Sequence, residues 1–161
     1  MSQYISFHIK TRTGDFLPIA CFSRSNIYYE FAYNYVPSYK EETPFTRTTL
    51  NYILADIKEE KEKEEKYLKQ YNDKLLLISG MNNSLEEKME YINSTNESIE
   101  YAQERISSLN DCYMFYCTLG YILDEADNTK WYSNKSRCLN PDDYIYAGIE
   151  CSLPGQQDEE E

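Results

Sequence analysis

The stretch LEEKMEYINSTNESIEYAQERISSLNDCY, residues 85–113, decides the fold. Large apolar side chains recur in it at strict seven-residue spacing, a pattern typical of a coiled-coil helix. These residues, called the apolar seam below, are Leu85, Ile92, Ile99, Ile106 and Tyr113. Ala102 and Leu109 fill some of the positions three residues further on, and no glycine or proline occurs before Gly120. The stretch therefore predicts one helix of about 40 residues, about 60 Å long.

The preceding segment, residues 43–79, predicts a partner helix. Thr43 and Pro44 suit an N-cap and a first helical position, and no further glycine or proline occurs before Gly80. Apolar residues recur at spacings of three and four on either side of an all-charged run, KEEKEKEEK, at residues 58–66. They are Leu54, Ile57, Leu68, Tyr71, Leu75 and Ile78. The turns that carry the charged run must be solvated.

A short turn connects the two predicted helices. Ser79 and Gly80 form a helix stop signal, and capping-box patterns follow at Asn83 and Ser84. A stop and a new start only a few residues apart predict an αα-hairpin.

The two ends of the chain carry strand signals. Residues 4–10 alternate between apolar and polar side chains, and residues 16–22 resume an apolar run after turn-forming residues, which predicts a β-hairpin. Pro18 cannot donate a backbone hydrogen bond, so the second strand must lie at a sheet edge or carry a bulge there. The run YIYAGIEC, residues 144–151, predicts a last strand that joins the hairpin.

The segment NIYYEFAYNYV, residues 26–36, carries conflicting signals. Its apolar residues keep four-residue spacing behind Ser23 or Ser25 as helix caps, whereas its residue types favour a strand. We predict a short helix.

These elements predict an α+β fold. A small antiparallel sheet, made of the N-terminal hairpin and the C-terminal strand, carries a long coiled-coil helical hairpin inserted between them. The expected organisation is an N-terminal part of the base at residues 1–42, the helical hairpin at 43–127, a C-terminal part of the base at 128–154 and an acidic tail at 155–161.

The charge of the chain constrains its partners. The net charge is −12 and the isoelectric point is about 4.6, which opposes direct binding to nucleic acid or to an anionic membrane and favours a basic protein partner. Residues 83–127 contain ten acidic residues and two basic ones. These acids form either a solvated face or a docking face for a basic partner. The candidate docking residues are Glu90, Glu97, Glu100 and Glu104.

Targeting signals and cysteine usage bear on localisation. No apolar run follows a basic stretch at the start, and the longest uncharged apolar segment, residues 112–123, is too short to span a bilayer. Five cysteines without a CxxC motif predict free thiols in a reducing compartment. We expect a cytoplasmic protein with no membrane association. The bias toward Tyr, Asn, Lys, Ile and Glu suits an AT-rich bacterial or phage genome, and a phage protein would act in the cytoplasm of its bacterial host.

Signatures of catalysis are missing from the sequence. It contains no GxGxxG, GxxxxGK[ST] or GxSxG motif. The single histidine, His8, lies on the polar side of the first predicted strand with no motif near it. Cys112 and Cys117 are about 140° apart on a helix and do not share a face. We therefore expect no enzyme, no cofactor and no metal site.

The sequence favours a non-catalytic interaction protein. The apolar seam exceeds what the charge-interrupted first helix can cover, so a homodimer would bury the surplus. The aromatic residues of 28–35 and 113–121 form either a packed core or an exposed tyrosine-rich binding patch. One alternative is that the acidic helix imitates nucleic acid and inhibits a host DNA- or RNA-handling defence enzyme. The other is a structural component of a larger assembly.

Overall fold

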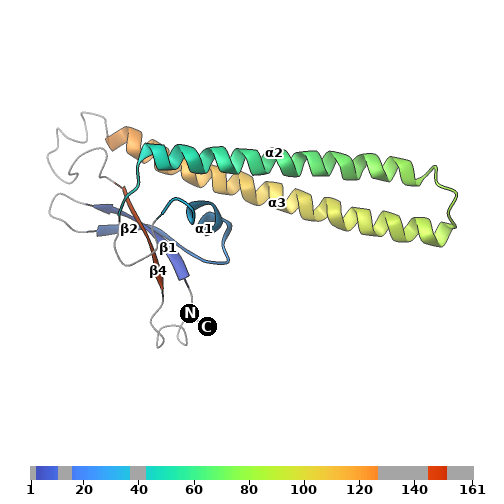
Figure 1. Ribbon diagram of the computed structural model, residues 1–161, viewed down its shortest axis with the longest axis horizontal. Helices are drawn as coiled ribbons and strands as arrows, with labels where there is room; N and C mark the ends of the chain where they lie inside the picture. Colours follow the sequence, from blue (N-terminus) through green and yellow to red (C-terminus); the bar gives the residue numbers. More distant parts are fainter. Residues whose placement is uncertain (1–2, 11–15, 37–42, 127–144, 152–161) are drawn as a thin grey trace. The chain divides into compact units, whose positions relative to one another are not determined.

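The computed structural model describes residues 3–10, 16–36, 43–126 and 145–151. Along the chain, the elements are β1 (Gln3–Lys10), β2 (Phe16–Ser23), α1 (Ile27–Ala32), β3 (Thr43–Pro44), α2 (Arg47–Ile78), α3 (Leu85–Ala126) and β4 (Ile145–Cys151) (Figure 1). The predicted α+β fold with a helical hairpin is confirmed.

The chain divides into two compact units. The first contains the sheet, α1 and one end of each long helix, and the second is the helical segment Ile57–Tyr113. The second unit is therefore shorter than the hairpin expected at residues 43–127, because both ends of that segment belong to the first unit. The predicted acidic tail, residues 155–161, lies outside the described residues, as does most of the segment expected at 128–154.

The sheet is antiparallel, with strand order β2-β1-β4-β3. The predicted last strand is confirmed as β4, which pairs with β1. The register between β1 and β2 shifts where Phe7 pairs with Ala20 but His8 pairs with Pro18. β2 thus lies at an edge and the ladder is irregular at its proline, as expected for a residue without an N–H group.

α1 confirms the short helix in the ambiguous segment. Its N-cap is Asn26, whose Oδ1 accepts a hydrogen bond from the backbone N–H of Tyr28 at 3.1 Å. The caps expected at Ser23 or Ser25 are wrong, because Ser23 is the last residue of β2 and its hydroxyl lies 3.1 Å from that of Ser25.

The helix start expected at Thr43 and Pro44 is also wrong. These two residues form β3 and pair with β4. The next residue, Phe45, donates its backbone N–H to the carbonyl of Ile145 at 2.6 Å and buries its side chain almost completely. This long-range contact keeps the backbone extended where the local sequence alone favours a helix.

The two long helices begin at residues with local capping bonds. α2 starts behind Thr46, whose Oγ1 accepts from the N–H of Thr49 at 3.3 Å. α3 starts behind Ser84, whose Oγ accepts from the N–H of Glu87 at 3.2 Å. One of the two predicted capping-box positions is therefore the N-cap of α3.

Aromatic side chains fill the core of the first unit. The ring centroid of Phe7 lies 5.4 Å from that of Phe45 and 5.7 Å from that of Phe115, and both pairs have edge-to-face geometry. Tyr116 is buried beside them and donates its hydroxyl to the carbonyl of Tyr28 at 2.6 Å. The core interpretation therefore holds for these rings, and the one buried tyrosine hydroxyl among them has a partner.

Candidate interaction surface on the helical hairpin

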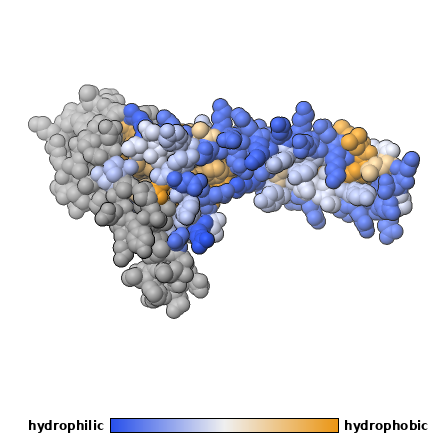
Figure 2. Space-filling view, viewed as in Figure 1, coloured by the Kyte–Doolittle hydropathy of each residue, from blue (hydrophilic) through white to orange (hydrophobic). Residues whose placement is uncertain are grey.

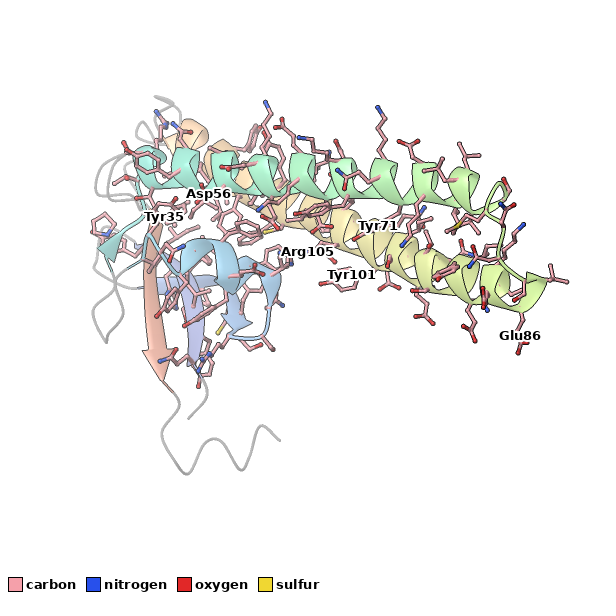
Figure 3. The ribbon with its side chains drawn as sticks, turned by 45° about the vertical axis from the view of Figure 1, so that its right-hand side comes forward. Tyr35, Asp56, Tyr71, Glu86, Tyr101 and Arg105 are labelled. Carbon is pink, nitrogen blue, oxygen red and sulfur yellow. The ribbon has the colours of Figure 1, made fainter. Side chains whose placement is uncertain are left out.

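In the second unit, α2 and α3 run antiparallel and lie side by side (Figures 1 and 3). From α3 the buried side chains are Thr95, Ala102, Leu109 and Cys112, and from α2 they are Ile57 and Ile78. The first three of these lie three residues after members of the apolar seam. In each heptad, the more deeply buried position is therefore the one three residues after a seam residue. Two of the residues at this position, Thr95 and Ala102, are small.

The apolar seam lies at the flank of this buried row. Leu85 is 79% exposed, Tyr113 is 38% exposed, and Ile92, Ile99 and Ile106 are half-buried. α2 therefore covers the seam only in part. The residues expected to mediate self-association remain accessible in the described part of a single chain.

The charged run of α2 meets α3 in the middle of the hairpin. Glu60, Lys61 and Glu64 are half-buried rather than fully solvated. Nη2 of Arg105 lies 3.9 Å from Oε1 of Glu60 on the other helix. Within α2, Nζ of Lys61 lies 3.8 Å from Oε1 of Glu65. Ion pairs as exposed as these contribute little to stability. This part of α2 consequently gives α3 little apolar cover.

Thr95 is the polar exception in the buried row. Its side chain is 2% exposed, and its Oγ1 has no hydrogen-bond partner within the described residues. A buried hydroxyl without a partner destabilises the folded state. The hairpin is therefore not optimised for packing between its own two helices.

The turn end of the hairpin carries an exposed apolar patch, here called the apolar tip. Its members are Leu76, Leu77, Met81, Leu85 and Met89. Leu76 is 76% exposed and Leu77 is 72% exposed. Figure 2 shows hydrophobic atoms at the right-hand end, where Figure 1 places the turn between α2 and α3.

Sequence reasoning missed the apolar tip, although a signal for it exists. Residues 75–78 read LLLI. Four consecutive residues point to all sides of a helix, so a single partner helix cannot cover them all. Leu75 and Ile78 take the covered side, and the two leucines between them face outward.

The four candidate docking glutamates are all exposed. Helix geometry places Glu90, Glu97, Glu100 and Glu104 within an arc of about 80°, on the side of α3 opposite the buried row. Glu86 and Asp111 lie in the same arc and are also exposed. The six acids are called the acidic stripe below. Figure 3 shows Glu86 on the side of α3 away from α2.

The acidic stripe holds uncompensated charge. The only basic residues of 86–111 are Lys88 and Arg105, which are both half-buried and lie outside that arc. None of the six carboxylates forms an ion pair within the described residues. The stripe is therefore a continuous negative face about 37 Å long.

A hollow of about 350 Å³ lies among described residues of the first unit. Its lining includes Arg47, Asn51, Cys117 and Tyr121, but no histidine or carboxylate. The sole histidine, His8, lies in β1 between Pro18 of β2 and Tyr146 of β4.

Among the described residues, no three His, Cys, Asp or Glu side chains are grouped so that they could hold a metal ion. None of the described helices combines the length and the apolar character that a membrane span requires.

Comparison with models of protein families, with curated proteins and with solved structures finds no match to this chain. The surfaces of the hairpin are therefore the basis for inferring function.

Proposed function

We propose that the protein is a non-catalytic interaction protein that self-associates through its helical hairpin. The observation that carries the proposal is the accessibility of the apolar seam, because heptad-spaced residues are normally covered by a partner helix. Leu85 and Tyr113 are exposed, and the isoleucines between them are half-buried. In a homodimer with two-fold symmetry, each protomer covers the seam of its partner.

The seam alone supports only weak association. Full burial of an isoleucine side chain contributes about 1.5–3 kcal/mol, so covering the remaining exposed part of one that is already half-buried contributes at most about 1 kcal/mol. Ile92, Ile99 and Ile106 of two protomers then contribute at most about 6 kcal/mol, near the low end of the association cost of about 4–15 kcal/mol. A stable dimer needs apolar area beyond these isoleucines.

The test is the mass in solution by light scattering. We expect the wild type to be a dimer at tens of micromolar, well above a dissociation constant of about 1 µM. Ile99→Asp combined with Ile106→Asp should give monomers, with circular dichroism reporting whether the helices persist. The matched control, Asn93→Asp with Ser107→Asp, adds the same charge at exposed positions of α3 and should stay dimeric. A wild type that is monomeric at this concentration contradicts the proposal.

The acidic stripe favours a second candidate function, in which α3 imitates nucleic acid and inhibits a DNA- or RNA-handling enzyme of a bacterial host. Lys and Arg side chains that grip phosphates are attracted equally by carboxylates, and such binding is fast and sensitive to salt. The uncompensated charge of the stripe supports this function. If the stripe serves only for solubility, the hairpin acts as a spacer in a larger assembly.

Charge reversal separates these two candidates. Glu90, Glu97, Glu100 and Glu104 are changed to Lys together, and wild type and variant are assayed against a panel of bacterial nucleases and DNA-binding enzymes. Mimicry requires the wild type to inhibit a member of the panel, with an effect that weakens steeply between low and moderate salt and disappears in the variant. Equal inhibition by both proteins contradicts mimicry, and inhibition by neither favours the spacer.

A further inference from the structure

The apolar tip is a second association surface that the seam does not account for. Four of its five members lie outside the seam, and Leu85 belongs to both. Together the five side chains expose the equivalent of about three whole apolar side chains. Exposed apolar side chains that gather at one place and are flanked by charge mark an interaction site in a monomeric protein.

The two helices bring opposite charge to this tip. The last thirteen residues of α2, 66–78, contain three lysines and one aspartate. The first thirteen residues of α3, 85–97, contain four glutamates and one lysine. A purely basic partner would be repelled by the end of α2, and a purely acidic partner by the start of α3. A surface with this division of charge is complementary to itself.

Individual charges lie beside the apolar residues that they would flank. Lys69 precedes Leu76 by seven residues and so lies on the same side of α2, about 10 Å away. Glu86 precedes Met89 by three residues and is its neighbour on α3. When a second copy is turned by 180° about the long axis of the hairpin, the lysine-rich end of its α2 faces the start of α3 of the first copy.

We propose that the apolar tip is the docking site for the tip of a second copy of this chain. The two hairpin ends overlap so that α2 of each copy packs against α3 of the other, as in a four-helix bundle. This proposal rests on the proposed self-association and adds the surface that mediates it. The tip supplies the apolar area that the half-buried isoleucines of the seam lack, and its charges set the orientation of the two copies.

The two exposed leucines allow a test that should leave the fold intact. Leu76→Asp combined with Leu85→Asp changes positions that are 76% and 79% exposed. Tyr101→Asp is the matched control, because Tyr101 is an exposed apolar residue of α3 away from the tip. Sedimentation of the full chain from 1 to 100 µM, a range of about two decades upward from a micromolar dissociation constant, gives the dimer affinity of each protein.

We expect the leucine variant to weaken the dimer by about a hundredfold or more and the tyrosine variant to leave it within about threefold of wild type. An unchanged dimer in the leucine variant overturns the tip proposal. If Ile99→Asp with Ile106→Asp then dissociates the same dimer, the proposed function stands with the seam as its surface. A wild type that stays monomeric over the whole range overturns both.

Discussion

Replacing Thr95 by Val should stabilise the hairpin. Thr95 is 2% exposed in the buried row, and its hydroxyl has no hydrogen-bond partner within the described residues. Leaving a buried hydroxyl without a partner costs about 1–3 kcal/mol, whereas a methyl group of the same shape carries no such cost. Thr and Val have similar helix propensities, so the backbone contributes little to the difference. We expect the free energy of unfolding to rise by about 1–2 kcal/mol.

The assay is thermal and urea unfolding followed by far-ultraviolet circular dichroism, which reports on the long helices. For a chain of this length, 1 kcal/mol corresponds to about 2–4 °C, so the expected increase in Tm is about 2–8 °C. Because dimerisation makes Tm depend on protein concentration, wild type and variant are compared at one concentration and also in the Leu76→Asp, Leu85→Asp background.

Thr95→Ser is the matched control, because it keeps the hydroxyl and removes the methyl group. It should lower the free energy of unfolding by about 1 kcal/mol, the contribution of one buried methyl group. If Val instead destabilises the protein, the reasoning is refuted. The hydroxyl would then be satisfied in solution, for example by rotating to the carbonyl of Tyr91 one turn earlier in α3, a bond that Thr commonly makes in helices.

Two further changes test the core of the first unit. Tyr116→Phe keeps the ring but removes the donor to the carbonyl of Tyr28, and should lower the free energy of unfolding in urea by about 1–2 kcal/mol; an unchanged value would mean that water satisfies the carbonyl. Gly120→Ala should also destabilise, because the added Cβ would lie 3.0 Å from Cδ2 of buried Leu50. In a Leu50→Val background the same change should raise the free energy of unfolding by about 1 kcal/mol through helix propensity, and a failure to reverse sign contradicts the steric explanation.

Much of the fold can be predicted from the sequence, because its strongest signals are local. Long segments without glycine or proline and with regular apolar spacing give α2 and α3, and Gly80 gives the turn between them. The start of α2 could not be predicted in this way. Thr43 and Pro44 resemble a helix start, but the hydrogen bond from Phe45 to Ile145 joins residues 100 positions apart and holds the segment in the sheet. Long-range pairing overrides local propensity here.

The candidate site is predicted less completely, for a geometric reason. Heptad spacing identifies two positions in each heptad but does not tell which of them lies deeper. The large residues Ile99 and Ile106 suggested the centre of the interface, whereas Ala102 and Leu109 occupy it. A small residue such as Ala102 lets the two helices approach, which leaves the larger isoleucines at the flank.

The acidic stripe and the apolar tip make different demands on a partner, and charge density discriminates between them. Six carboxylates over about 37 Å give one charge per about 7 Å, compared with one per about 1.7 Å along duplex DNA. The stripe of one chain is therefore too dilute to imitate a duplex, and a dimer joined at the tips offers two stripes of that same density, which is a longer row of charge but not a denser one. We therefore expect any nucleic-acid mimicry to need both stripes and to follow self-association, so the Leu76→Asp, Leu85→Asp variant should lose both together. A monomeric variant that still inhibits an enzyme through Glu90, Glu97, Glu100 and Glu104 would refute this order and make the single helix sufficient.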